Sequence, residues 1–217
     1  MLKRMVAAVL GVGVLAGCGG SSQPDWSNAD IARVKEVRSS FGPEFQVTEI
    51  GPSGVDPKLL GPQKLPPGLR FDPKDCFGAT QVVPPGVQGN MAAVTAEGAG
   101  NRFIVIAVET SEDVPLNRPA ANCQKVAFEG SGIRGLVEVV ESPHIDDVET
   151  LGVRRIVGTI VDGKQRVGQV YNYIADFGHF LVIVTANPLV IPNQPVAPVD
   201  TQRARDLLTA AVKAVQG

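Results

Sequence analysis

Short apolar segments separated by tight turns fill the middle of the chain, and this pattern constrains the fold more than any other feature. Residues 90–97 and 102–110 flank a Gly-Ala-Gly-Asn turn, and residues 153–161 and 166–175 flank an Asp-Gly turn. Asp-Gly is typical of two-residue β-hairpins, and strands joined by such short turns are antiparallel. We therefore expect an α+β fold with an antiparallel sheet of about six to seven strands. The other strands of this sheet are expected at residues 124–129, 133–141 and 179–186, and a separate short strand at residues 45–50.

An N-terminal and a C-terminal helix are expected to pack against this sheet. Residues 27–41 carry apolar side chains at helical spacing behind Ser27, which we expect to cap the first helix. A second apolar stripe runs through residues 204–215, after a cap at Asp200 or Thr201. Each helix therefore has one apolar face with which it can cover the sheet.

Two of the expected strands are too apolar for a sheet that is buried on one face only. Residues 103–108 and 180–184 are apolar at every position, which is typical of central strands covered on both faces. Two helices can cover only one face. We therefore expect the long segment rich in proline and glycine, residues 51–89, or a ligand or partner, to shield part of the other face.

The first seventeen residues indicate an export signal. Two basic residues precede an apolar run of about ten residues, which is too short to span a membrane. The run ends in Leu-Ala-Gly-Cys at Cys18. This ending resembles the bacterial lipobox, which implies cleavage before Cys18 and a diacylglyceryl group on its thiol. We then expect residues 1–17 to be removed, residues 18–26 to form a lipidated tether, and residues 27–217 to form one α+β domain on the outer face of the cell membrane. The alternative is an ordinary secretory signal that happens to contain a cysteine.

Two cysteines remain once Cys18 is assigned to the lipid. Cys76 and Cys123 form an even pair, and such a pair in an exported protein is expected to be a disulfide. It would close a loop of about 48 residues, which by chain entropy stabilises a fold by roughly 4 kcal/mol. A zinc site is the alternative, but zinc ligands lie at close spacing and the chain has no CxxC or HxxxH.

Charge and composition exclude several classes of function. The formal net charge is −2, and aromatic residues make up 5% of the chain. The chain therefore lacks both the positive charge that neutralises phosphates and the aromatic platforms that stack on bases, so we expect no nucleic-acid binding. No motif indicates a cofactor or a metal, and we expect neither.

Catalytic motifs are also missing. The two histidines are His144 and His179, and a serine hydrolase needs one of them beside an exposed serine and a carboxylate. Neither a GxSxG nor an SxxK motif occurs. His144 precedes two aspartates that could bind a metal, although a solvated acidic loop is the simpler interpretation, and His179 is expected to be a hydrogen-bonded turn residue. We therefore expect no enzyme, with a small hydrolase as the weakest alternative.

Two groups of side chains on the last hairpin could contribute to a binding site. Arg154, Arg155 and Arg166 are interpreted as charges on strands that face water, or as a small basic patch. Tyr171 and Tyr173 share one face of their strand and either belong to the core or line a groove. We expect this groove to be roofed by part of the segment 51–89.

Several short segments of the sequence resemble those of a known family. The chain resembles mycobacterial envelope lipoproteins of unknown function. The resemblance is carried by the lipobox, the cysteine pair and three short segments: Asn-Pro-Leu-Val at 187–190, Thr-Gln-Arg-Ala at 201–204 and Phe-Gly-Pro-Glu-Phe at 41–45. More distantly, the order of helix, antiparallel sheet and helix resembles the extracellular sensor-like domains of mycobacterial serine/threonine kinases. Those domains carry two disulfides and a cleft thought to bind a ligand, whereas this chain has one candidate disulfide.

The combined expectation is a lipid-anchored envelope protein that acts as a non-enzymatic binding or sensor-like module. Its expected ligand is apolar or amphipathic, for example a lipid, and its expected contact with the membrane is the lipid anchor. The alternative is a protein–protein adaptor that binds an envelope protein through an exposed sheet edge or the proline-rich loops.

Overall fold

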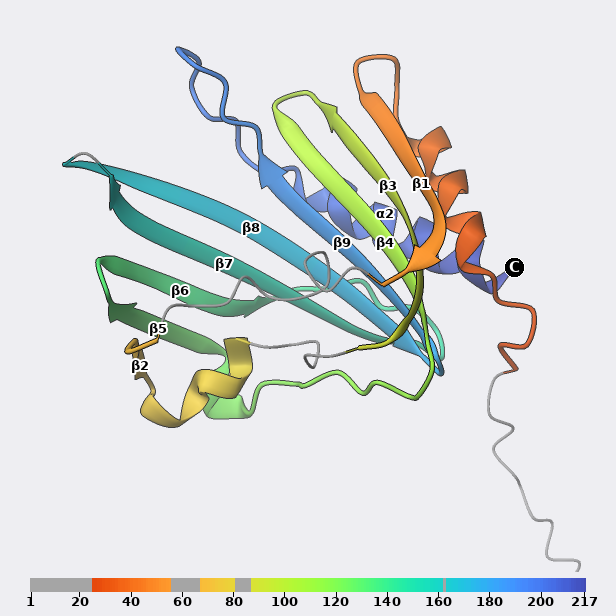
Figure 1. Cartoon of the computed structure of the whole chain (residues 1–217), viewed down its shortest axis with the longest axis horizontal. Helices are drawn as coiled ribbons and strands as arrows, with labels where there is room; N and C mark the ends of the chain where they lie inside the picture. The colour runs from red at the N-terminus through yellow and green to blue at the C-terminus, as the bar shows by residue number, and fades with distance from the viewer. Residues whose placement is uncertain (1–24, 56–66, 81–86, 162) are drawn as a thin grey trace, which may run out of the picture.

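The computed structural model describes most of the expected domain (Figure 1). The described residues are 25–55, 67–80, 87–161 and 163–217. The expected signal peptide and Cys18 lie outside them, as does much of the segment 51–89. Within the described residues, no helix is both long enough and apolar enough to cross a membrane.

One antiparallel sheet of nine strands dominates the described residues. The expected count of six to seven strands is therefore wrong. The strand order is β1-β3-β4-β9-β8-β7-β6-β5-β2. The bounds are β1 (Gln46–Gly54), β2 (Arg70–Asp72), β3 (Gly89–Gly98), β4 (Asn101–Thr110), β5 (Lys125–Gly130), β6 (Ile133–Val140), β7 (Glu149–Val161), β8 (Lys164–Phe177) and β9 (Phe180–Pro188).

β1 and β2 form the two edges of the sheet: β1 corresponds to the short strand expected at residues 45–50, and β2 is the strand that the sequence does not predict. β1 pairs with β3 and continues past residue 50 to Gly54, beyond an irregularity in the register between Ile50 and Ser53. β2 lies inside the segment that we expected to be irregular and pairs with β5, with Phe71 opposite Phe128. A strand of three residues is too short to show an alternating pattern, which is why the sequence does not predict it.

Two helices cover one face of the sheet, and both lie behind it in Figure 1. η1 (Ile31–Ser40) is a 3₁₀ helix, and α2 (Thr201–Gln216) is an α-helix. The first begins later than expected, because the carboxylate of Asp30 rather than Ser27 accepts the capping hydrogen bond, from the Ala32 N–H at 2.8 Å. α2 is capped by Asp200 as expected. Two further short 3₁₀ helices are η2 (Lys74–Thr80) and η3 (Ala121–Cys123).

The sheet carries a separate apolar core on each face. The first lies under η1 and α2 and includes Phe103, Val182 and Leu207. The second lies on the opposite side, which we call the far face. Its buried members are Met91, Ala93, Ile106, Val108, Leu116, Phe128, Val137, Leu151, Val153, Ile174, Leu181 and Ile183. The expectation that central strands are covered on both faces is therefore met within the described residues.

Described parts of the segment 51–89 contribute to the far face. Val55, Leu69, Phe71 and Val87 are half-buried and pack against its core. The loop after β4 adds Val114 and Leu116.

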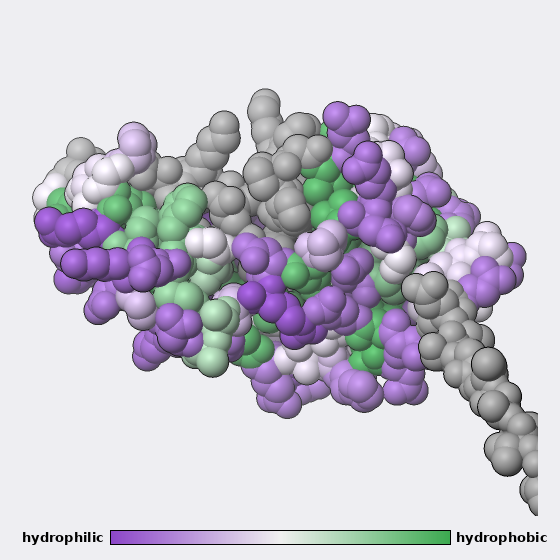
Figure 2. Space-filling view, turned by 90° about the horizontal axis from the view of Figure 1, so that it is seen from below, coloured by the Kyte–Doolittle hydropathy of each residue, from purple (hydrophilic) through white to green (hydrophobic). Residues whose placement is uncertain are grey.

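On the side seen in Figure 2, which views the molecule from below, apolar areas appear as separate patches among hydrophilic residues.

A disulfide joins this segment to the edge of the sheet. Cys76 in η2 is bonded to Cys123 in η3, with the two Cα atoms 5.4 Å apart. Cys76 is almost fully buried and packs with Ala79 and Val126. β2 forms three residue pairs with β5. The disulfide adds a covalent link that holds η2, and with it the neighbouring β2, near β5.

Candidate functional site

An arginine lies among the apolar residues of the far face. Along β7, Leu151, Val153 and Val157 contribute to the far-face core. Because side chains of a strand alternate between faces, Arg155 lies on the same side as these residues. It is half-buried, so the expectation that the charges of this strand face water is wrong for Arg155.

Burial changes the electrostatics of this arginine. Loss of water around the guanidinium lowers the pKa of Arg155. An arginine nevertheless stays protonated at neutral pH. The far face therefore carries a fixed positive charge whose surroundings are poorer in water than those of a surface arginine.

Two polar residues continue from Arg155 across the neighbouring strands. Asn172 on β8 lies diagonally across from Arg155, which is itself opposite Val170. Asn172 pairs with Thr185 on β9, and the Thr185 hydroxyl donates a hydrogen bond of 2.9 Å to the Asn172 side-chain oxygen. We call Arg155, Asn172 and Thr185 the Arg155 patch. All three are half-buried.

Apolar side chains surround the Arg155 patch. Val137 lies opposite Arg155 on β6, and Ile104 lies opposite Thr185 on β4. Val153 and Val157 flank Arg155 along β7. A guanidinium within such a surface can hold an anionic group while the neighbouring side chains contact hydrocarbon.

The preceding residue, Arg154, faces the other way. Its guanidinium donates hydrogen bonds to Glu138 at 2.9 Å and to Gln169 at 3.2 Å. It also lies 5.7 Å from the centre of the Tyr171 ring. Arg154 thus lies on the helix-covered face and Arg155 on the far face.

Both tyrosines that we expected in a groove lie on the helix-covered face. Tyr171 and Tyr173 are stacked with ring centres 6.4 Å apart. Tyr173 is 1% exposed within the core under α2, and burial raises its pKa. The described parts of the segment 51–89 pack on the opposite face, so they do not form the expected groove with these tyrosines.

The two histidines lie at the surface. His144 is 3.4 Å from Asp146, and both side chains are more than 90% exposed. His179 is 3.2 Å from Asp113, and both are again mainly exposed. A catalytic base is normally held in one orientation by buried partners, whereas both of these histidine–aspartate pairs are mainly exposed to solvent. Within the described residues, no group of three or more His, Cys, Asp or Glu side chains could hold a metal ion.

A half-buried carboxylate, that of Asp176, lies at the end of the sheet where β8 finishes. The pKa of Asp176 is raised to about 6, first by burial and then by the negative charges of Glu149 and Asp113. The Leu116 backbone N–H donates a hydrogen bond to it and opposes this rise. Asp176 therefore helps to hold the loop whose Leu116 side chain packs on the far-face core.

We expect Asp176→Asn to stabilise the protein at neutral pH. The folded-state pKa of about 6 is above the ordinary aspartate value of 3.8, so ionisation of Asp176 opposes folding above pH 6. The variant should gain about 1–2 kcal/mol in free energy of unfolding at pH 7.5, after allowance for solvent screening. This gain should disappear by about pH 4, where the folded wild type holds the proton.

Urea denaturation of both proteins at the two pH values measures this difference. Asp146→Asn is the matched control, because its carboxylate is 96% exposed, and it should behave as wild type at both pH values. An Asp176→Asn protein that gains the same stability at pH 4 as at pH 7.5 would contradict the assignment.

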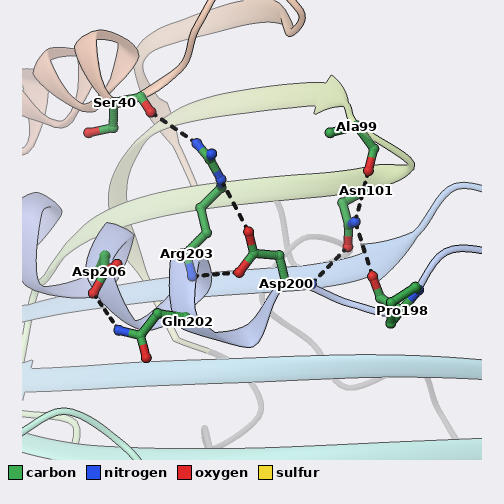
Figure 3. A network of polar contacts seen from close by, with 8 residues as sticks. All are labelled: Ser40, Ala99, Asn101, Pro198, Asp200, Gln202, Arg203 and Asp206. Atoms are coloured by element: carbon green, nitrogen blue, oxygen red, sulfur yellow. Dashed lines mark hydrogen bonds and ion pairs between the residues drawn. The ribbon is translucent and has the colours of Figure 1, made fainter.

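A polar network at the start of α2 surrounds a shallow hollow of about 310 Å³ (Figure 3). Arg203 donates to the Ser40 carbonyl at 3.2 Å and lies 3.5 Å from the Asp200 carboxylate. Its guanidinium is 5.0 Å from the centre of the Phe45 ring. The remaining lining residues are Gln202, Asp206 and Leu207.

The same network fixes the proline-rich connector before α2. Asn101 is 4% exposed and donates to the Ala99 and Pro198 carbonyls, both at 3.2 Å. Its side-chain oxygen accepts from the Asp200 N–H. These groups bond to one another, as Figure 3 shows, so we assign the network to packing of η1, α2 and the connector rather than to ligand binding.

Comparisons with known proteins identify relatives without a described activity. Residues 30–216 match a family model described as a domain of unknown function, DUF5642. An X-ray structure of an uncharacterized protein from Mycobacterium smegmatis, the Rv0999 ortholog, is 59% identical, with a TM-score of 0.83. The match covers 89% of this chain and all of that one.

A second solved structure is much less similar. The extracellular domain of PknH from Mycobacterium tuberculosis is 13% identical, with a TM-score of 0.36, over 89% of this chain and all of that one. No curated protein matches the chain. The expected relation to mycobacterial proteins of unknown function is confirmed.

Proposed function

The chain belongs to the DUF5642 family, whose function is unknown, and we propose that it is a non-enzymatic module that binds an amphipathic anion on the far face of its sheet. Its location is the outer face of the cell membrane, where a lipid on Cys18 anchors it. The observation that supports the binding function is Arg155, a half-buried guanidinium within an apolar surface.

The chemistry of this surface selects the ligand class. The interaction between opposite charges strengthens as water is removed from around them, so Arg155 attracts an anion more strongly than a surface arginine does. The planar guanidinium fits a carboxylate or a phosphate with two hydrogen bonds. Val157 and Ile104, which are half-buried, offer apolar area to an alkyl chain, at about 25 cal/mol for each Å² removed from water.

Arg154 provides a matched control for the role of Arg155. The two residues are adjacent and have the same charge, but they lie on opposite faces of the sheet. Arg155→Met should weaken binding of a fluorescent long-chain fatty acid at least tenfold, since hydrogen bonds to charged groups contribute roughly 1.5–3 kcal/mol each. Arg154→Met should bind within about twofold of wild type, and Arg155→Lys should retain part of the affinity.

Fluorescence titration of the purified mature protein measures these affinities, with circular dichroism as the check on folding. A lysophosphatidic acid of equal chain length, used as competitor, distinguishes a phosphate preference from a carboxylate preference. Equal affinities of the Met variants, or no binding of either amphiphile by wild type, would refute the proposed site.

A further inference from the structure

The hairpin of β7 and β8 extends beyond the end of β9. β8 pairs with β9 only from Tyr171, opposite Ala186, to Phe177, opposite Phe180. Residues 164–170 of β8 pair with β7 on one side. On their other side, no strand pairs with them in the part of the chain that the structure describes. Figure 1 shows this hairpin projecting past β9.

β9 does not continue beside residues 164–170 of β8, because it ends at Pro188. Pro188 has no N–H with which to continue the ladder. The next residue, Leu189, instead donates its N–H to the Gly100 carbonyl at 2.8 Å, in the turn between β3 and β4. Asn101 bonds to Pro198 at the other end of the connector. These bonds direct the connector away from β8, and in Figure 1 the two diverge.

Of the features that usually prevent strand pairing at an edge, residues 164–170 carry charged side chains but neither a proline nor an irregular register. At the edges of this sheet, β2 is only three residues long, and β1 contains Pro52 and an irregular register. Residues 164–170 contain no proline, and their register with β7 is regular. Such an edge presents backbone N–H and C=O groups that can pair with an extended chain.

The side chains along this edge differ between the two faces. Lys164 and Arg166 point to the far face and are exposed, whereas Val167 points to the other face and is 62% exposed. Ile160 on β7 is diagonal to Val167 and is 71% exposed. A strand added here would place one set of alternate side chains beside two cations and the other set beside exposed apolar residues.

We propose that residues 164–170 bind an extended segment of another protein, which adds to the sheet as a strand and alternates acidic and apolar side chains. Acidic side chains pair with Lys164 and Arg166, and apolar side chains cover Val167. Residues 151–170 carry four basic and one acidic residue, whereas the whole chain has a net charge of −2. This local positive charge favours an acidic partner and disfavours a second copy of the same edge.

The position of the edge favours a protein over a membrane surface. Trp26, near the N-terminal tether, packs on Phe177 at the other end of β8, with ring centres 5.3 Å apart. Lys164 and Phe177 are thirteen residue steps apart along β8, a span of about 45 Å. With the anchor at Cys18, the open edge lies at the end of the sheet away from the tether.

A labelled peptide of alternating glutamate and valine tests the proposal, with the full-length mature protein purified in detergent with its lipid anchor. Fluorescence anisotropy should show binding, at least tenfold tighter than that of a peptide with the same residues in two blocks. Arg166→Glu should weaken binding at least tenfold. Arg134→Glu, at an exposed arginine of β6, a strand that is paired on both sides, should stay within twofold of wild type.

Hydrogen exchange locates the peptide on the protein. The amides of residues 164–170 should become protected when the peptide is bound. No binding below 1 mM, equal binding of both peptides, or protection confined to other strands would overturn the proposal. Formation of a dimer through residues 164–170, or binding to anionic vesicles that depends on Arg166 in place of binding to the peptide, would overturn it as well.

Discussion

Replacement of Cys18 by alanine is expected to abolish membrane attachment. In a lipoprotein the thiol of this residue receives the diacylglyceryl group, and no other cysteine of the chain follows a lipobox. Two or more acyl chains give stable anchoring, whereas one chain binds only marginally. The variant should therefore accumulate as precursor or appear in the soluble fraction, while the wild type stays in the membrane fraction.

Cell fractionation with immunoblotting measures this change, and mass spectrometry of the mature wild type should show an N-terminal lipidated cysteine. Ser22→Ala, in the expected tether, is the control and should remain anchored. Normal maturation and membrane attachment of the Cys18→Ala protein would show that the lipoprotein assignment is wrong.

Removal of the disulfide is expected to have the largest effect on stability. The double variant Cys76→Ala/Cys123→Ala should lose up to about 4 kcal/mol in free energy of unfolding, because the unfolded chain is no longer held in a closed loop. This corresponds to a melting temperature lower by about 10 °C for a domain of this size. The affected region includes β2, which among the described strands pairs with β5 alone.

Thermal and urea denaturation of the double variant measure this loss, and non-reducing peptide mapping of the wild type should link Cys76 to Cys123. Reduced wild type is the control for the substitutions themselves and should match the variant. A stability change below about 1 kcal/mol, or free thiols at both positions in the exported protein, would count against this role.

Tight turns and regular patterns made most of the sheet predictable. The Asp-Gly turn and the glycine turn at residues 98–101 fix the hairpins β7–β8 and β3–β4. α2 was equally visible, because its apolar residues recur at helical spacing. β2 was not, because three residues show no periodicity, and its place is set by contacts with β5 that are distant in sequence.

The choice of residues for the proposed site depends on which face of the sheet the helices cover, and the alternation of side chains along a strand does not show this. Along β7 each set of alternate residues contains one arginine and several apolar residues, so Arg154 and Arg155 look equivalent in the sequence. Tyr171 and Tyr173 likewise share a face, but only the position of α2 shows that this face belongs to the helix-covered core. Arg155 can be recognised as a charge within an apolar face only once Leu151 and Val153 are assigned to the far face.

Native mass spectrometry of the lipidated protein, purified gently from its own envelope, tests the central claim most directly. The account predicts a mature chain that begins at lipidated Cys18 and retains its disulfide. It further predicts a non-covalently bound acidic amphiphile in the wild type and in Arg154→Met, and its loss from Arg155→Met. A wild-type protein without any such ligand, or an Arg155→Met protein that retains it in full, would contradict the claim that the far face binds an amphipathic anion.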